Sequence, residues 1–292
     1  MSSSRVVAVL GMHRTGTSLL TRGLKSLGVY LGDDFLEAKP DNPTGYWEDR
    51  NIVSFNERVL KVFGLQWESV AFLRDAQWEE PEIEAIRLKA IGYIRANFVS
   101  HPLWGFKDPR TVRLLPFWSP VFQRLGVEDA YVIVIRHPLS VAQSLCARQY
   151  ELDATTSHCL WLLYMVPYLR MIAQKPFVVT DYDLLMDDPR GQLERIRRAL
   201  EIPPTDTSSV EIEDFVANFL DPQLRHSQFG RLDRDLVPHL SLIVQEAYLC
   251  ISRLASDRIG PDRSRFWSEW KQVEGTTRRF FENECSVPEQ NV

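Results

Sequence analysis

Residues 11–18 join two glycines, an arginine and three hydroxyl side chains in a single short turn. They read Gly-Met-His-Arg-Thr-Gly-Thr-Ser and follow the apolar run 6–10, which predicts a buried parallel strand. The leucines after Thr17 recur at helical spacing, so the turn lies between a strand and a helix. Such a turn directs backbone N–H groups and the positive end of the helix toward one point, and Arg14 adds a cation there. The pattern therefore predicts a site for phosphate or sulfate groups.

One position separates this turn from the phosphate-binding loop of ATP-using enzymes. That loop reads GxxxxGK followed by serine or threonine, and its lysine reaches the β- and γ-phosphates. Gly11 and Gly16 have the same spacing here, but Thr17 stands where the lysine would be. The difference argues against a kinase or ATPase and leaves Arg14 as the cation of the loop.

A second set of candidate anion-binding residues follows another predicted strand. Residues 130–135 form a continuous apolar run that ends at Arg136. Parallel strands of an open α/β sheet bind ligands at their carboxyl ends, so we expect Arg136 at the same edge as the first turn. Ser144 and Arg148 lie one helical turn apart on the helix that should follow, and they share a face. Together these three residues could hold a second phosphate group.

The two sets of residues together resemble the sulfotransferases that use 3′-phosphoadenosine-5′-phosphosulfate (PAPS). In that family one loop binds the 5′-phosphosulfate, and an arginine with a serine further along binds the 3′-phosphate. The matching residues of this chain are Arg14, Thr15, Gly16, Thr17 and Ser18 for the first group, and Arg136 and Ser144 for the second.

The tyrosylprotein-sulfotransferase branch of the family suggests further site residues. They are Lys107 (within Lys107-Asp108-Pro109), Arg148 and Tyr182. The resemblance extends over roughly residues 5–190. It implies PAPS as the co-substrate, a hydroxyl group of a saccharide or small molecule as the acceptor, and no metal.

The resemblance also implies how these residues would act. In-line transfer places negative charge on the bridging oxygen of the leaving group, and Lys107 and Arg14 are the expected cations for it. Many cytosolic members carry a histidine base two residues after the lysine, but Pro109 occupies that place here. We expect Glu48, at the end of a proline- and glycine-bearing loop, to serve as the base. The remaining alternatives are Asp33, Asp34 and Asp108.

Two other functions stay open on sequence alone. The first is a P-loop phosphotransferase such as a kinase, which the missing lysine and the lack of a convincing acidic Mg²⁺ ligand oppose. The second is a non-catalytic nucleotide-binding protein, which would need neither Lys107 nor a base.

Two further groups of side chains have both a structural and a functional interpretation. The tryptophans at Trp67, Trp78 and Trp104 would line either an acceptor site or the core. The run Arg195, Arg197 and Arg198 predicts the solvated face of a helix.

The elements that would position these residues alternate along the chain. Strands are predicted at 6–10, 103–106, 130–135 and 177–180, and helices at 17–27, 48–63, 81–98, 155–172 (kinked at Pro167), 191–201, 238–255 and 263–284, with one more running from 138 to about Tyr150. This alternation predicts an α/β fold with a P-loop-NTPase-like parallel sheet flanked by helices. We expect a single domain, with residues 1–200 as the α/β core and 201–292 as a mainly helical extension.

The composition is that of an ordinary globular protein, with 45% hydrophobic and 25% charged residues in a chain of 292. A net charge of −5 argues against broad binding to nucleic acid. The sequence suggests neither a signal peptide nor a membrane-spanning run, and its four scattered cysteines predict reduced thiols and a cytoplasmic location. The helical C-terminal third is a candidate homodimer interface.

Overall fold

A parallel sheet forms the centre of the protein in the computed structural model, which describes residues 4–39, 42, 45–73, 75–147, 152–220, 241–257 and 263–284. Within these residues the strands are β1 (Arg5–Leu10), β2 (Leu103–Lys107), β3 (Glu128–Ile135) and β4 (Phe177–Asp181), in the order β2-β1-β3-β4. The first strand of the chain is therefore central, because Arg5 pairs with Leu103 on one side and with Glu128 on the other. The predicted class, α/β with a parallel sheet, is confirmed.

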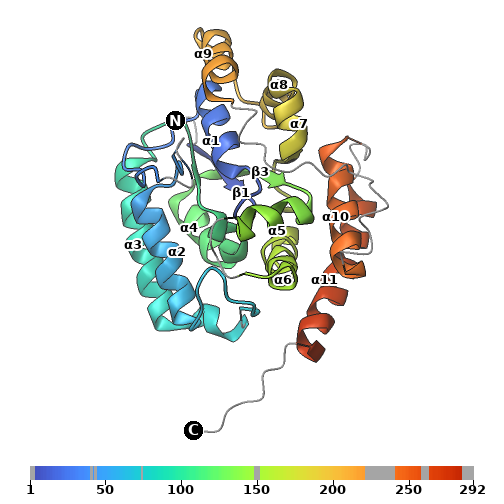
Figure 1. Cartoon of the computed structure of the whole chain (residues 1–292). Coiled ribbons are helices and arrows are strands. Elements are labelled where there is room, and N and C mark those ends of the chain that lie inside the picture. Colours follow the sequence, from blue (N-terminus) through green and yellow to red (C-terminus); the bar gives the residue numbers. More distant parts are fainter. Residues whose placement is uncertain are drawn as a thin grey trace.

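Helices cover both faces of this sheet, as Figure 1 shows. In chain order they are α1 (Thr17–Ser26), α2 (Arg50–Val62), α3 (Pro81–Asn97), α4 (Leu115–Leu125), α5 (Pro138–Cys146), α6 (Ala154–Met165), α7 (Tyr182–Asp187), α8 (Pro189–Ala199), α9 (Ser208–Asp214), α10 (Leu242–Ala255) and α11 (Ser264–Glu284). Shorter helical turns are η1 (Asp75–Glu79), η2 (Pro109–Leu114), η3 (Leu169–Ile172) and η4 (Phe215–Phe219).

The alternating side chains of β1 separate two hydrophobic cores. Val7 and Val9 pack in a smaller core with apolar residues of α1 and α8. Val6, Ala8 and Leu10 belong to a larger core on the other face, to which α2 to α6, α10 and α11 contribute. With both faces covered, the strands can be apolar along their whole length, which is why they are continuous hydrophobic runs in the sequence.

The structure contains three helices that the sequence did not predict, α4, α7 and α9, and a fourth, α6, is shorter than predicted. Prolines explain the differences at α4 and α6. Helix α4 was not predicted, because Pro120 lies inside it and interrupts the helical pattern. The expected kinked helix through residue 172 is wrong, since α6 ends at Met165 and Leu169–Ile172 forms a separate turn. Pro167 lies between them and lacks the N–H that a continuous helix would need.

Two of the three tryptophans belong to the core. Trp104 is fully buried at the start of β2, and Trp78 is buried beside Phe63 and Tyr168. An acceptor-binding role for these two side chains is therefore wrong. Trp67 differs, because it is only half-buried and lines the cavity described below.

The C-terminal helices α10 and α11 lie together along one flank of the molecule in Figure 1, where α10 packs against β4. Arg195 stabilises this contact, because it donates to the carbonyls of Val179 in β4 and Leu254 in α10, at 2.7 and 2.8 Å. It also forms an ion pair with Asp257. The prediction of a solvated face is thus wrong for Arg195. In the part of the chain that the structure describes, no helix is both long and apolar enough to cross a bilayer.

Candidate active site

The turn between β1 and α1 is held in its shape by contacts within the protein. Gly16 has a φ of 93°, and a Cβ atom at this position would lie 2.3 Å from Cδ2 of Tyr182. Arg14 has a φ of 69°, in the left-handed region that side-chain-bearing residues rarely adopt. The N–H and the hydroxyl of Thr15 both donate to the carbonyl of Met12, at 3.3 and 2.8 Å. Thr15 therefore shapes the turn from inside and does not line the cavity.

The fit between Gly16 and Tyr182 leads to a first prediction. Gly16→Ala should lower the free energy of unfolding by about 1–3 kcal/mol, because alanine is strained at this φ and its methyl group would collide with the tyrosine ring. Gly92→Ala is the matched control, since Gly92 lies in α3 with nothing within 4 Å of an added Cβ. Urea unfolding measures both, and equal effects of the two substitutions would contradict the role given to Gly16.

A buried ion pair lies on one side of the turn. Lys107, the last residue of β2, donates from Nζ to Oε1 of Glu48 at 2.6 Å and to the hydroxyl of Ser18 at 3.0 Å. Both charged side chains are buried, with side-chain exposures of 1% for Lys107 and 8% for Glu48. Three separate elements thus meet at one point: the carboxyl end of β2, the start of α1, and the loop before α2.

Burial sets the protonation of Glu48. Removal from water raises the pKa of this carboxyl, and the charge of Lys107 opposes the effect only in part, so the pKa lies above the ordinary value for glutamate. A carboxylate with a raised pKa is suited to accept a proton near neutral pH.

The other candidate carboxylates have different surroundings. Asp108 is fully buried and accepts from the backbone and guanidinium of Arg110 and from the amide of Asn56. These bonds fix the turn that follows Lys107. The exposed Asp33 accepts from the hydroxyl of Tyr30. Asp34 is also exposed and pairs with Arg50. Neither Asp33 nor Asp34 is part of the cavity lining.

A second group of cations lies on the other side of the turn. Arg136, which follows β3, donates from Nη1 to the carbonyl of Arg14 at 3.3 Å, and its guanidinium lies 4.3 Å from the ring centre of Tyr182. Arg14 donates from Nε to the hydroxyl of Ser144 on α5 at 2.7 Å. The structure therefore joins Arg14 to Ser144, whereas the sequence analysis places it with Lys107. Arg148 lies outside the described residues.

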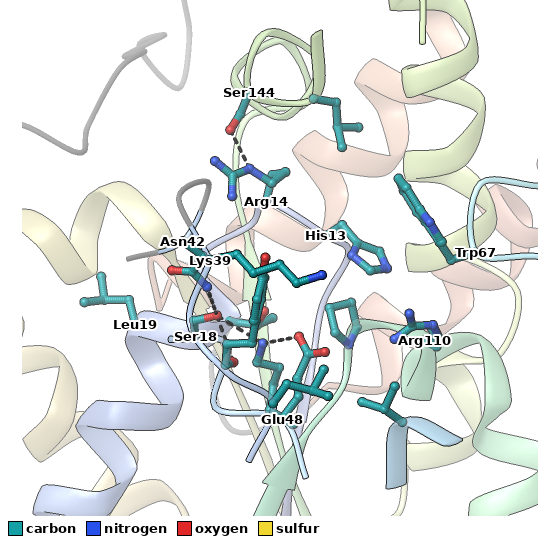
Figure 2. Close-up of a pocket in the computed structure, with 18 of the residues that line it drawn as sticks. His13, Arg14, Ser18, Leu19, Lys39, Asn42, Glu48, Trp67, Arg110 and Ser144 are labelled. Carbon is teal, nitrogen blue, oxygen red and sulfur yellow. Dashed lines mark hydrogen bonds and ion pairs between the residues drawn. The ribbon is translucent and has the colours of Figure 1, made fainter. Parts of the chain in front are cut away.

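Both groups open into one cavity of about 750 Å³ at the carboxyl edge of the sheet. Figure 2 shows Arg14 and Ser144 at one end of it and Ser18 and Glu48 at the other. The predicted site residues that line it are Arg14, Gly16, Thr17, Ser18, Glu48, Lys107, Arg136, Ser144 and Tyr182. Within the described ranges, no group of three or more His, Cys, Asp or Glu side chains is arranged to hold a metal ion.

Sequence reasoning singled out Trp67 in the remaining wall, but not Arg110 or Glu57. Trp67 lies with its ring centre 4.5 Å from that of His13 in the turn, and its carbonyl accepts from the hydroxyl of Tyr164 at 2.8 Å. Arg110 pairs with Glu57 at 3.0 Å, and both line the cavity. The only sequence signal for Arg110 was its position directly after Lys107-Asp108-Pro109.

The fold and the cavity together define an α/β protein with a large, cation-bearing pocket at the carboxyl edge of a parallel sheet. No family model matches the chain, and no curated protein matches it. Its similarities are to solved structures of bacterial sulfotransferases. One is the sulfotransferase domain of the olefin synthase from Synechococcus PCC 7002, with 14% identity, a TM-score of 0.42, and coverage of 95% of this chain and 96% of that one.

A sulfotransferase from Mycobacterium avium is 16% identical, with a TM-score of 0.46 over 94% of this chain and 77% of that one. The sulfotransferase domain of the curacin biosynthetic pathway is 14% identical, with a TM-score of 0.42 over 95% and 99% of the two chains. At these levels of similarity the function has to be argued from the site itself.

Proposed function

We propose that this protein is a sulfotransferase that moves a sulfuryl group from PAPS to a hydroxyl group of a saccharide or small molecule. The observation that carries the proposal is the pair of cationic groups at opposite ends of one cavity. Lys107 and Ser18 form one group, and Arg136, Arg14 and Ser144 form the other. A donor with separate 5′ and 3′ anionic groups needs two such sites.

The proposed donor site follows from what each element offers. The backbone N–H groups at the start of α1, with Thr17 and Ser18, would bind the 5′-phosphosulfate, because a helix N-terminus favours anions. Arg136 and Ser144 would bind the 3′-phosphate, with Arg148 as a further candidate. Tyr182 packs against Gly16 and under Arg136, where a nucleotide would meet it.

The proposed mechanism is an in-line displacement at sulfur. The oxygen of the acceptor hydroxyl attacks sulfur while Glu48 takes the proton of that hydroxyl. The bond between sulfur and the bridging oxygen of PAPS breaks at the same time. The negative charge that develops on this oxygen, as 3′-phosphoadenosine-5′-phosphate departs, is stabilised by Lys107. The contact of 2.6 Å between Lys107 and Glu48 supports this assignment, since it brings the base and the cation to one place. The mechanism does not require a metal.

The acceptor would bind between Glu48 and the wall formed by Trp67. This wall combines a flat indole with the charged pair Arg110–Glu57, and both can contact a ring that bears several hydroxyls. A non-catalytic nucleotide-binding protein is the weaker alternative, because it gives no reason to bury Glu48 against Lys107.

We also propose that the protein acts as a single domain in the cytoplasm. The four cysteines are scattered along the sequence and none lies in a CxxC pair, which supports a reducing compartment.

Thermal unfolding with nucleotides tests the donor. A ligand that binds only the folded state at a hundredfold excess over its dissociation constant stabilises it by about 2.7 kcal/mol. We expect 3′-phosphoadenosine-5′-phosphate to raise the melting temperature, and ATP and adenosine 5′-phosphate to have much smaller effects. Arg136→Ala should abolish the rise, whereas Arg198→Ala, at an exposed position of α8, should retain it. An equal rise with ATP would favour a P-loop phosphotransferase.

A further inference from the structure

Arg14 has a position in the structure that its place in the turn does not predict. A cation inside this turn is expected to face the 5′-phosphosulfate. Its Nε instead donates to Ser144, a residue 130 positions further along the chain. We propose that the guanidinium of Arg14 binds the 3′-phosphate of the donor together with Arg136, and thereby selects 3′-phosphorylated nucleotides. This inference rests on the proposed function.

The backbone fixes Arg14 on this side of the cavity. Strands β1 and β3 are neighbours, and the pairing of Leu10 with Ile133 brings their carboxyl ends together. The carbonyl of Arg14 accepts from Arg136, and its side chain reaches Ser144 on the next helix. Arg14 is thus tied at two points to the segment that follows β3, and Figure 2 shows it at the Ser144 end of the cavity.

The other end of the cavity already has a cation. Lys107 contacts both Ser18 and Glu48 there, so the proposed reacting centre has its positive charge without Arg14. The side chain of Arg14 is bonded instead to Ser144, at the opposite end of the cavity (Figure 2). The geometry therefore favours a division in which Lys107 binds the 5′ group of the donor and Arg14 binds its 3′-phosphate.

The chemistry of the 3′ end explains why a second arginine is useful. A phosphate monoester carries nearly two negative charges at neutral pH, and a planar guanidinium can bond two of its oxygens at once. The guanidinium of Arg136 lies over the ring of Tyr182, 4.3 Å from its centre, which favours one position for this cation. A nucleotide that lacks the 3′-phosphate offers these two guanidinium groups no anionic acceptor at this position, so it gains none of this charge-assisted hydrogen bonding.

Calorimetric titration of the full chain with two nucleotides tests the division. The probes are 3′-phosphoadenosine-5′-phosphate and adenosine 5′-phosphate, which differ only in the 3′ group. We expect Arg14→Gln to weaken binding of the first by about 10- to 100-fold, as loss of a charged hydrogen bond does, and to change binding of the second less than threefold. Ser18→Ala, at the other end of the cavity, should weaken both nucleotides by a similar factor.

Ser144→Ala provides a second test that leaves the backbone of the turn intact. We expect Ser144→Ala to reduce affinity for the 3′-phosphorylated nucleotide. In the double variant with Arg14→Gln, the loss of affinity should be smaller than the product of the two single losses, because the two side chains act as one unit. Losses that simply multiply would overturn the inference.

The outcomes separate this inference from the proposed function. If Arg14→Gln weakens both nucleotides equally, Arg14 binds the 5′ group, and the inference is overturned while the donor assignment stands. If the unaltered protein does not prefer the 3′-phosphorylated nucleotide, the donor assignment itself is overturned, and the inference with it.

Discussion

Lys107→Met is expected to lower the rate of sulfuryl transfer by about 10²–10³-fold, the usual effect of losing one group that stabilises developing charge. Lys107 is the buried cation that contacts both Ser18 and Glu48. Its removal would leave the bridging oxygen without a nearby positive charge, and would raise the pKa of Glu48 further, since Lys107 now lowers it. The measurement is formation of 3′-phosphoadenosine-5′-phosphate from PAPS with an acceptor found by screening.

Lys89→Met is the matched control for this prediction, because it makes the same change at an exposed position of α3. Its rate should equal that of the unaltered protein. A Lys107→Met variant that binds the desulfated nucleotide and still transfers at a normal rate would remove Lys107 from the mechanism.

Glu48→Gln is expected to lower the transfer rate by about 10²–10⁴-fold, the range that general base catalysis contributes. The unaltered protein should also lose activity as pH falls, because protonation of Glu48 removes the base. Burial raises the pKa of this carboxyl, so the loss should be centred above the ordinary value for glutamate. In Glu48→Gln, this acid limb of the pH–rate profile should disappear.

Asp34→Asn tests the choice among carboxylates. Asp34 was an alternative base, but it is exposed and pairs with Arg50. The substitution should leave both the rate and the acid limb unchanged. An acid limb that persists in Glu48→Gln and is lost in Asp34→Asn would move the base to Asp34.

The sequence was sufficient to predict the sheet and one edge of the cavity. Each strand is a short apolar run, and the residues of interest follow the strands directly, as Lys107 and Arg136 do. Because the carboxyl ends of parallel strands share one edge, the chain order alone brings these side chains together. Glu48 was harder to predict, since a loop of more than ten residues separates it from the preceding helix, and only the fold places it beside Lys107.

What the sequence could not predict depends on contacts between distant side chains. The bond between Arg14 and Ser144 spans 130 residues, and no local sequence pattern indicates whether Arg14 contacts Ser144 or Lys107. Arg195 was misassigned for a similar reason, because its partners lie in β4 and α10. Charge runs along a helix indicate exposure only when no neighbouring element covers that face.

Because β1 lies between β2 and β3, it can pair with its neighbours only after those later strands have been made. A ribosome releases this strand first, at about 5–20 residues per second, yet its neighbours begin only at Leu103 and Glu128. Such distant parallel pairing is intrinsically slow. The contacts of Arg14 with Arg136 and Ser144 can therefore form only after the segment that follows β3 has been made. A nascent chain that ends before Ile135 carries the turn but lacks the lining residues Arg136, Ser144, Leu145, Tyr182, Met186 and Phe219, so the cavity is completed only after the segments beyond β3 have been made.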